Sequence, residues 1–442
     1  MKKIDTITLS GKYGKDCKIY SNDLDINSIS FLYDILNNPV SENNKIRIMP
    51  DVHYGNGCIV GFTMKIQDQI NPEHIGCDIG CTVSAIITKT SIPENIELEK
   101  IDYKIRNQIP TGMNINDKPV IDEKDFYKFL RKEYSKAKSS WPEVLESINI
   151  DENYISKMLK KLNMDPSIFY KSLGTLGGGN HFIEISKTDN DTYALIVHSG
   201  SRNFGIKVWK YWTNISKNPR KIKNIKEKER EIRNKYKGNG EKIKESIQKL
   251  HKDPNNIIKG NGYLFGEDMI GYLTDMVIAQ AYAKYNHITI QNRIIKSLKW
   301  KIDDIIWSVH NYIDFTDHIL RKGSTRSYLG EKLLIPLNMK DGTLICEGKS
   351  NEDWNYSAPH GLGRRFSRSE SKNFITLEDY IKTMKGIYSS SICKETIDES
   401  PMAYKDPNYI MNQINDTVTI LYRLYPIINI KSQNILDRNE QD

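Results

Sequence analysis

Cysteine is scarce in this sequence. Six cysteines are spread over 442 residues, from Cys17 to Cys393, without the close spacing of a small disulfide-bonded scaffold. Such usage is typical of a reducing compartment, where thiols are free or bind metal. No stretch of about 18 apolar residues exists, and the polar segment 1–20 lacks the apolar core of a secretory signal. These absences exclude a membrane-spanning helix and predict a cytoplasmic protein.

Neither sign of charge dominates the chain. The 64 Lys and Arg residues exceed the 56 Asp and Glu residues by eight, which gives a formal net charge of +8. This mild basic excess favours a polyanionic partner without requiring one. A hydrophobic fraction of 38% allows a large core. Because internal repeats and long linkers are also absent, we expect one catalytic domain spanning 1–442.

Short runs rich in β-branched residues alternate with helical segments, which predicts a mixed α/β (α+β) fold. The expected strands are Ile46–Met49, ended by Pro50, and then Thr82–Thr88 and Tyr193–Val197. We expect helices in the segment 91–170 and a buried helix near 268–285.

The segment 215–262 differs from its surroundings. Within it, residues 217–253 are almost all polar, and Lys, Arg and Glu predominate. They predict a basic helical insertion, an exposed helical hairpin with salt-bridged faces that is broken at Gly238-Asn239-Gly240. Direct contact with RNA phosphates is the alternative interpretation.

The most informative segment is SAPHGLGRRFSR, residues 357–368. His360 is followed by several arginines, whose guanidinium groups suit phosphate. Gly361 and Gly363 allow the backbone to approach a ligand closely. Because histidine can act as a covalent nucleophile, the segment suggests an imidazole that accepts a phosphoryl or nucleotidyl group. A surface loop with a metal-binding or structural histidine is the alternative.

A second pattern indicates a metal site. Among only nine histidines, four lie at expected strand ends or Gly-rich turns: His53, His181, His198 and His310. The segment GCDIGC (76–81) adds a carboxylate and a thiol, and we choose Cys81 over Cys77 because it shares a turn with Asp78. Two metal ions bridged by the thiolate would use Asp78, Cys81, His181, His198 and His310. Ligand softness alone predicts zinc, and each histidine could instead be structural.

The Gly-rich segment LGTLGGGN (173–180) can direct backbone N–H groups at an anion. It lacks the Lys-Ser/Thr ending of a P-loop, which argues against a Walker-type nucleotidase.

Together these segments resemble the RtcB family of GTP-dependent RNA ligases. The similarity rests on MPDVHYGNG (49–57), IGCDIGC (75–81), SLGTLGGGNHFIEI (172–185), VHSGSRNFG (197–205), SVHN (308–311), RKGSTR (321–326), SAPHGLGRRFSR (357–368) and ESPMAYKD (399–406). They follow the family order and extend from 49 to about 431.

The resemblance implies the family's mixed α/β fold and a role for each matching residue. The five metal-ligand candidates match the ligands of two Mn²⁺ ions, which replaces the expectation of zinc. His360 matches the histidine that GTP guanylylates. Residues around the guanylate are matched by Asn180, Phe182, Glu184, Tyr404 and Lys431. Phosphate-binding arginines are matched by Arg202, Arg364 and Arg368, and Asp51 matches an aspartate close to the reacting ends.

The implied activity joins an RNA 3′-phosphate or 2′,3′-cyclic phosphate end to a 5′-OH end, in RNA repair or tRNA splicing. It proceeds through a GMP–histidine intermediate and an activated RNA 3′ end. An activator of the archease type is a candidate partner. Two alternatives remain open: a metal-dependent cyclic phosphodiesterase that has lost ligation, and a non-catalytic RNA-binding protein.

Several departures from the family pattern indicate a divergent branch, which suggests repair of a dedicated damaged RNA. The family usually has Cys-His-Gly-Ala-Gly where this chain has PHGLG (359–363), so Leu362 could crowd the guanylate. The loop before the nucleophile reads PLNMKDGT (336–343) in place of a Gly-Ser-Met-Gly type loop. Asn338 and Thr343 are the candidates to supply its contacts.

Overall fold

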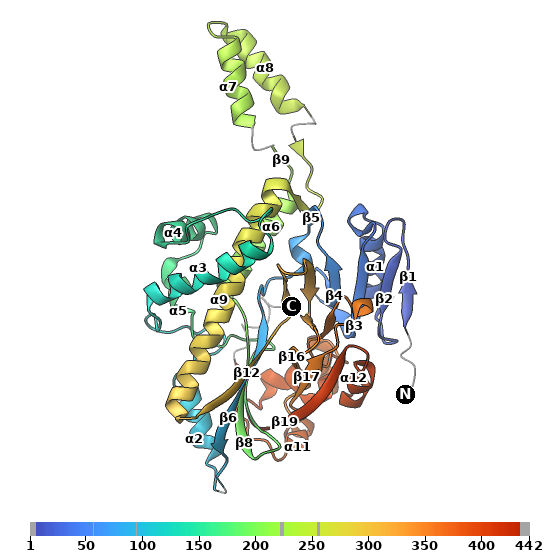
Figure 1. Ribbon diagram of the computed structural model, residues 1–442, viewed down its shortest axis with the longest axis vertical. Helices are drawn as coiled ribbons and strands as arrows, with labels where there is room; N and C mark the ends of the chain where they lie inside the picture. The colour runs from blue at the N-terminus through green and yellow to red at the C-terminus, as the bar shows by residue number, and fades with distance from the viewer. Residues whose placement is uncertain (1–5, 56, 94, 222–224, 254–256, 434–442) are drawn as a thin grey trace.

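The computed structural model describes residues 6–433 except 56, 94, 222–224 and 254–256. The fold is mixed α/β, as predicted, and two sheets form its centre (Figure 1). The larger sheet has seven strands in the order β12-β6-β8-β7-β19-β17-β16, and all neighbouring strands are antiparallel. These strands are β6 (Thr82–Ser91), β7 (Phe182–Lys187), β8 (Thr192–Ser199), β12 (Ile302–Val309), β16 (Lys332–Pro336), β17 (Thr343–Gly348) and β19 (Val418–Ile430). The strands expected at 82–88 and 193–197 are confirmed.

The second sheet has six strands in the order β1-β2-β3-β4-β14-β13. Its strands are β1 (Ile7–Leu9), β2 (Asp16–Ile19), β3 (Lys45–Tyr54), β4 (Ile59–Lys65), β13 (Asn311–Ile313) and β14 (Ile319–Lys322). The prediction that the strand ends at Pro50 is wrong, because β3 continues to Tyr54. The register between β3 and β4 shifts between Ile48 and His53. Pro50 lies in this irregularity, where its missing N–H interrupts no regular ladder.

His310 connects the two sheets. It is the single residue between the end of β12 in the larger sheet and the start of β13 in the smaller sheet. A short ladder of β15 (Ser324–Arg326) with β18 (Ser357–Pro359) adjoins it, since Ser324 N donates to His310 O at 3.2 Å. A further short ladder pairs β5 (Gln69–Ile70) with β11 (Leu264–Phe265). Side chains from both sheets can therefore meet at this junction.

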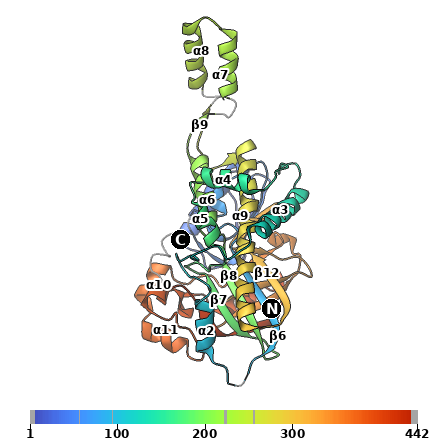
Figure 2. The ribbon, with the colours of Figure 1, turned by 90° about the vertical axis from the view of Figure 1, so that its left-hand side faces the viewer.

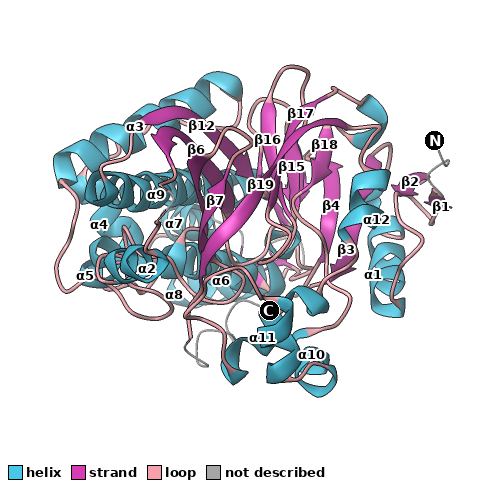
Figure 3. Cartoon of the chain, turned by 90° about the horizontal axis from the view of Figure 1, so that it is seen from below, coloured by secondary structure: helices cyan, strands magenta, loops and turns pink. Residues whose placement is uncertain are grey.

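Helices lie on both sides of the strands, as the view from below shows (Figure 3). One group comprises α2 (Leu98–Arg106), α3 (Glu123–Ser140), α4 (Glu152–Lys161), α5 (Pro166–Lys171), α6 (Arg202–Lys217) and α9 (Gly266–Leu298). The other comprises α1 (Ile26–Leu36), α10 (Arg368–Phe374), α11 (Leu377–Thr383) and α12 (Pro407–Gln413). Within the described residues, every helix is too short or too polar to cross a bilayer.

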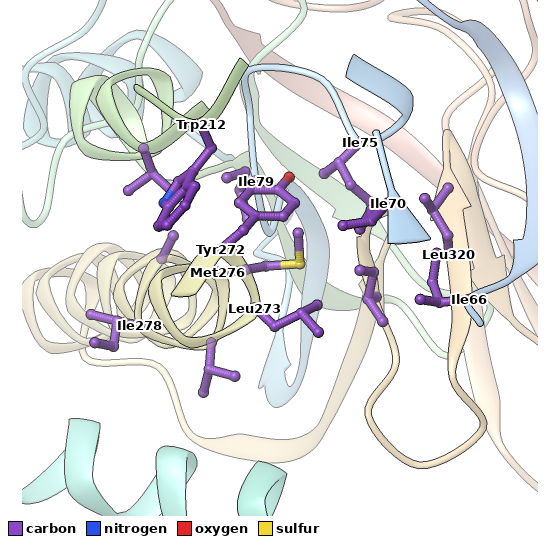
Figure 4. Close-up of a cluster of buried hydrophobic side chains, with 14 of the residues drawn as sticks. Ile66, Ile70, Ile75, Ile79, Trp212, Tyr272, Leu273, Met276, Ile278 and Leu320 are labelled. Atoms are coloured by element: carbon purple, nitrogen blue, oxygen red, sulfur yellow. The ribbon is translucent and has the colours of Figure 1, made fainter. Parts of the chain in front are cut away.

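Helix α9 is longer than the predicted 268–285. The second half of α9 buries polar side chains, including Asn286, His287 and Gln291. A buried helix is predicted from apolar residues at helical spacing, so these polar positions hid its continuation. Asn286 bonds the backbone of the Gly-rich segment through Gly174 N and Thr175 O. The first half packs apolar side chains, among them Tyr272 and Met276, in the core shown in Figure 4.

Alternate side chains of the larger sheet enter two cores. Ile183, Ile185 and Leu195 pack with Ile290 and Ile294 of α9 on one face. Phe182, Ile196 and Leu334 belong to the core on the other face. Successive side chains of a strand point to opposite faces, so this alternation shows that the sheet is buried on both sides.

The basic segment contains two helices, α7 (Ile225–Lys235) and α8 (Gly240–Lys252), separated at residues 236–239. They stand on a two-stranded stem of β9 (Arg220–Lys221) and β10 (Ile257–Ile258), which the sequence did not predict. Residues 217–258, from the end of α6 to the end of β10, are called the arm. Figures 1 and 2 show the arm extending from one end of the molecule along its longest axis.

Candidate active site

The four predicted ligands other than Asp78 lie at the same end of four neighbouring strands of the larger sheet. Cys81 precedes β6, His181 precedes β7, His198 lies near the end of β8, and His310 follows β12. Because neighbouring strands are antiparallel, the starts of β6 and β7 meet the ends of β8 and β12. The register accordingly places His198 opposite both Phe182 and Val83.

These side chains converge at short distances. Sγ of Cys81 lies 3.2 Å from Nε2 of His198 and 3.6 Å from Nε2 of His181. Nε2 of His198 lies 3.3 Å from Nε2 of His310, and Nε2 of His181 lies 3.0 Å from Oδ2 of Asp78. Cys81, His181 and His198 form a cluster that could hold a metal ion. Asp78 adjoins His181 and Cys81, and His310 adjoins His198.

The electrostatics of the cluster fit a cation. Burial lowers the pKa of His198 and His310 well below the ordinary value, so both imidazoles are neutral and keep a nitrogen lone pair. Burial, together with Asp78, raises the pKa of the Cys81 thiol well above its usual value. A bound cation would reverse that effect, because thiols that coordinate metal are deprotonated. Thiolate and imidazole donors of this kind are borderline-soft metal ligands.

Neighbouring groups keep the Asp78 carboxylate ionised and fix its position. Burial would raise its pKa, but the hydrogen bond and charge of His181 outweigh burial and lower it. Its Oδ1 accepts a hydrogen bond of 3.1 Å from the backbone N of Ser201. A Cβ at Gly200 would overlap the carboxylate, so a glycine is needed there.

His360 lies beside this cluster. It follows β18, and its ring centroid is 4.8 Å from that of His310. Its Nδ1 lies 2.8 Å from Oδ2 of Asp51, and the same oxygen accepts from the His360 backbone N at 3.2 Å. The Asp51 side chain is fully buried, whereas 17% of the His360 side chain is exposed. With the Nδ1 proton directed at Asp51, Nε2 carries the lone pair.

Gly363 allows this pairing to form. Its φ of +73° is unfavourable for any residue with a side chain, and a Cβ there would lie 2.7 Å from the carbonyl oxygen of Asp51. Gly361 is less constrained, since its nearest contact for a Cβ would be Pro336 O at 3.3 Å. Leu362 packs into a hydrophobic cluster with Leu337 and Ile410. Its extra bulk, compared with alanine, is accommodated by that core.

A second group of predicted residues meets around a carboxylate that the sequence analysis did not single out. Glu399 is fully buried, and its Oε2 lies 2.7 Å from Nζ of Lys431 and 3.0 Å from the Tyr404 hydroxyl. Its Oε1 lies 2.6 Å from Nη1 of Arg368. Burial would raise the pKa of Glu399, but Lys431 and the nearby arginines lower it. The available signal was its position at the start of ESPMAYKD (399–406).

Strand β7 carries the remaining members of this group. Phe182 and Glu184 are two residues apart and therefore share a face of the sheet. Nζ of Lys431 lies 5.3 Å from the Phe182 ring centroid and 3.4 Å from the carbonyl oxygen of Asn180. Glu184 accepts hydrogen bonds from Ser186 and Asn429. Burial nevertheless raises its pKa to about 7.

The predicted phosphate-binding arginines make specific hydrogen bonds. Nη2 of Arg364 donates to the carbonyl oxygen of Asp398 at 2.6 Å, and Nη1 of Arg368 donates to Oδ2 of Asp398 at 2.7 Å. Arg202 begins α6 with a left-handed φ of 55°. Its Nε donates to Thr175 Oγ1 at 3.2 Å, and its Nη2 to Gly112 O at 2.9 Å.

The unusual loop 336–343 stabilises itself. Oδ1 of Asn338 accepts from the backbone N of Lys340 and of Asp341, and its Nδ2 donates to the Asp341 carboxylate. Thr343 is fully buried in β17, and its hydroxyl has no hydrogen-bond partner within the described residues. Asn338 and Tyr404 both line a cavity of about 590 Å³.

A histidine oriented by a buried carboxylate, next to a cluster of metal-type ligands, suits an enzyme that transfers nucleotidyl or phosphoryl groups. Comparison with known proteins identifies its family. The model of the family described as tRNA-splicing ligase RtcB matches residues 37–432, and the chain belongs to this family.

Similar proteins occur in bacteria and archaea. The chain is 27% identical to the RNA-splicing ligase RtcB of Escherichia coli K12, over 87% of this chain and 90% of that protein. It is 26% identical to the tRNA-splicing ligase RtcB of Aeropyrum pernix, over 81% and 82% of the two chains. The corresponding values for Methanococcus maripaludis are 25%, 84% and 84%. The expected family is confirmed, and the low identities fit a divergent branch.

Proposed function

We propose that this RNA ligase joins an RNA 3′-phosphate or 2′,3′-cyclic phosphate end to a 5′-OH end, with His360 as the residue that carries GMP. The observation that supports it most is the contact between His360 and Asp51. The carboxylate can only accept, so it favours the proton on Nδ1 and makes Nε2 the proposed nucleophile, on a side chain that is 17% exposed.

In the first step, Nε2 attacks the α-phosphorus of GTP, a P–N bond forms, and pyrophosphate leaves. The positive charge that develops on the imidazole is stabilised by the Asp51 carboxylate 2.8 Å from Nδ1. The guanylate then passes to the RNA 3′-phosphate. Attack of the 5′-OH on this activated end forms the new phosphodiester and releases GMP. A 2′,3′-cyclic phosphate is first opened by water.

We propose that the metal is Mn²⁺ and that two ions bind to Asp78, Cys81, His181, His198 and His310. When bound, they would neutralise charge that develops on the phosphate oxygens. Two of these ligands, His198 and His310, hold their Nε2 atoms 3.3 Å apart although both are neutral. With both rings protonated on Nδ1, neither Nε2 can donate to the other, and a shared cation would accept both lone pairs.

The guanylate site is proposed to comprise Asn180, Phe182, Glu184, Gly361, Gly363, Tyr404 and Lys431. Asn338 and Thr343 are proposed to contribute from loop 336–343. Glu399 is expected to position Lys431 and Tyr404, because its Oε2 contacts both. Arg202, Arg364 and Arg368 are proposed to hold phosphates through their guanidinium groups.

The setting of the enzyme is part of the proposal. We propose a single catalytic domain spanning 1–442 with a helical basic insertion at 215–262, acting in the cytoplasm in RNA repair or tRNA splicing. RNA and GTP are the proposed substrates. An activator of the archease type is the candidate protein partner. It would be recognised by its stimulation of GMP transfer to His360.

The test uses GTP radiolabelled at the α-phosphate, with Mn²⁺ and the full chain. Covalent label is expected on the wild type and absent from His360→Ala. The matched control His251→Ala, which removes a histidine of α8, should label normally. RNA halves bearing 3′-phosphate and 5′-OH ends should then be joined, as read by gel. An unlabelled protein that still opens cyclic phosphates would be a phosphodiesterase and would overturn the proposal.

A further inference from the structure

The arm carries the whole basic excess of the chain. Residues 217–258 contain 14 of the 64 Lys and Arg residues and 6 of the 56 Asp and Glu residues, a formal charge of +8. The rest of the chain therefore holds 50 residues of each sign and has no formal net charge. Any attraction of the protein for a polyanion through net charge is thus concentrated in one element.

Carboxylates within the arm's two helices cannot balance its cations. Residues 225–252 hold ten Lys and Arg residues but only five Glu residues. Two of the acidic groups already have partners there, Glu245 with Lys249 at 2.8 Å and Glu229 with His251. Among the described residues, the exposed cationic side chains of this hairpin that make no ion pair include Lys226, Arg230, Arg233 and Lys244 on the helices, and Lys237 just after α7.

The apolar side chains of the arm are used between its own helices. Ile232 on α7 and Ile243, Ile247 and Leu250 on α8 are half-buried, and the two helices pack against each other. Among the described residues of the arm, no large hydrophobic side chain is exposed. The arm therefore offers a charged, hydrated surface and lacks the apolar face that insertion into a lipid surface requires.

Helix α6 relates the arm to the candidate site. It starts at Arg202, next to the serine whose N–H binds Asp78, and it ends at Lys217, where the arm begins. Sixteen helical residues span roughly 24 Å at about 1.5 Å per residue. A phosphate bound by the arm would thus lie roughly 24 Å or more, and so several base pairs of an A-form duplex, from the reacting ends.

We propose that the arm is a second RNA-binding element, which holds the phosphate backbone of the RNA being joined at a distance from its ends. Its contacts are electrostatic and read no sequence, because Lys and Arg side chains facing outward on two helices suit phosphates. The inference rests on the proposed function only for the identity of the polyanion. RNA is favoured over an acidic protein because the family acts as an RNA-splicing ligase and α6 leads directly from the site to the arm.

The first test removes charge without changing the helices. The arm variant carries Lys226→Gln, Arg230→Gln, Arg233→Gln, Lys237→Gln and Lys244→Gln, since Gln is a good helix former. Its matched control removes five exposed lysines from α3 and α4: Lys124→Gln, Lys128→Gln, Lys132→Gln, Lys157→Gln and Lys160→Gln. Both variants have the same net charge, so they separate a local contact from a general charge effect.

Binding of a fluorescent RNA duplex of about twenty base pairs is measured by anisotropy at several salt concentrations. The arm variant should bind about tenfold more weakly near 0.1 M salt, and the slope of log K against log salt should fall by about 3. The control should change the slope by less than about 1. Equal losses in the two variants, or no loss in the arm variant, would overturn the proposal.

A second variant removes the helices altogether. Because Lys221 pairs with Ile257 at the end of the stem, residues 222–256 can be replaced by a two-residue Asn-Gly turn. The KM for RNA ends on stems of about twenty base pairs should rise about tenfold, whereas stems of about six base pairs should be joined unchanged. An equal effect on both stems would overturn the proposal.

GMP labelling of His360, measured without RNA, tests the proposed function independently of the arm. The arm variants should label as the wild type does. If no form of the protein accepts GMP, the proposed function fails, while the salt dependence of RNA binding still decides the role of the arm.

Discussion

Nζ of Lys431 lies 2.7 Å from Oε2 of Glu399, and both side chains are almost completely buried. Lys431 follows the last strand, β19, whereas Glu399 lies in a short helical segment that precedes that strand. The same carboxylate contacts Arg368 and Tyr404. One buried anion thus contacts Tyr404 and Lys431, which the resemblance matches to the guanylate site, and Arg368, which it matches to a phosphate-binding arginine.

Removing the charge of Glu399 should destabilise the fold. Glu399→Gln leaves the buried cation of Lys431 without this counter-ion, whereas Arg368 keeps Asp398. Breaking a buried pair in this way costs about 3 kcal/mol. Urea unfolding measures the free energy. The exposed control Glu378→Gln on α11 should change it by less than about 0.5 kcal/mol. Equal stability of the two variants would show that Glu399 is not needed as a counter-ion.

The charge of Asp51 should accelerate transfer of GMP to His360. Asp51→Asn keeps a hydrogen-bond acceptor near Nδ1 but removes the anion that stabilises the imidazolium. We expect the single-turnover rate of labelling to fall by about a hundredfold or more. The exposed residue Asp68 supplies the control Asp68→Asn. A wild-type rate for Asp51→Asn would argue against His360 acting through this pair.

Glu184 should make stability depend on pH. Burial raises its pKa from 4.5 to about 7, so over this range the folded protein keeps a proton that the unfolded chain has released. Folding then takes up a proton, and stability falls as the pH rises through the range, by up to about 3 kcal/mol. Glu184→Gln should remove this fall. Chemical unfolding without ligands at pH 5 and pH 8 measures it, and identical pH profiles for variant and wild type would contradict the assignment.

Metal binding should distinguish the two cysteines of GCDIGC (76–81). Cys81→Ser replaces the sulfur that lies 3.2 Å from His198 Nε2 by a poorer donor, and Mn²⁺ affinity should fall by about a hundredfold. Cys77→Ser should bind Mn²⁺ as the wild type does. Titration followed by the paramagnetic resonance of free Mn²⁺ measures both. Loss of affinity in Cys77→Ser alone would reverse the choice of ligand.

Leu362 should matter for stability and not for the size of the nucleotide site. Leu362→Ala leaves a cavity among Leu337 and Ile410 and should cost about 2 to 4 kcal/mol in the free energy of unfolding. The concentration of GTP needed for half-maximal labelling should stay unchanged. Tighter GTP use by Leu362→Ala would show instead that the leucine crowds the guanylate. The exposed residue Leu329 offers the control Leu329→Ala.

Local pattern was sufficient for much of the fold. The strands at 82–88 and 193–197 were predictable because runs of β-branched and apolar residues favour the extended conformation. Two elements were misjudged at their ends. Strand β3 passes Pro50 because an irregular register accepts a missing N–H. Helix α9 continues to Leu298 through buried polar side chains such as Asn286, whose partners lie far away in the sequence.

The sequence by itself determined the residue types of the site and the family, since each motif is a short contiguous run whose chemistry can be recognised without coordinates. Only the tertiary structure decided which of these groups touch. Asp51 meets His360 across 309 positions, and Glu399 gathers Lys431, Arg368 and Tyr404. Such pairings depend on how strands from two sheets are brought to one edge, and this long-range packing leaves no periodic signal along the chain.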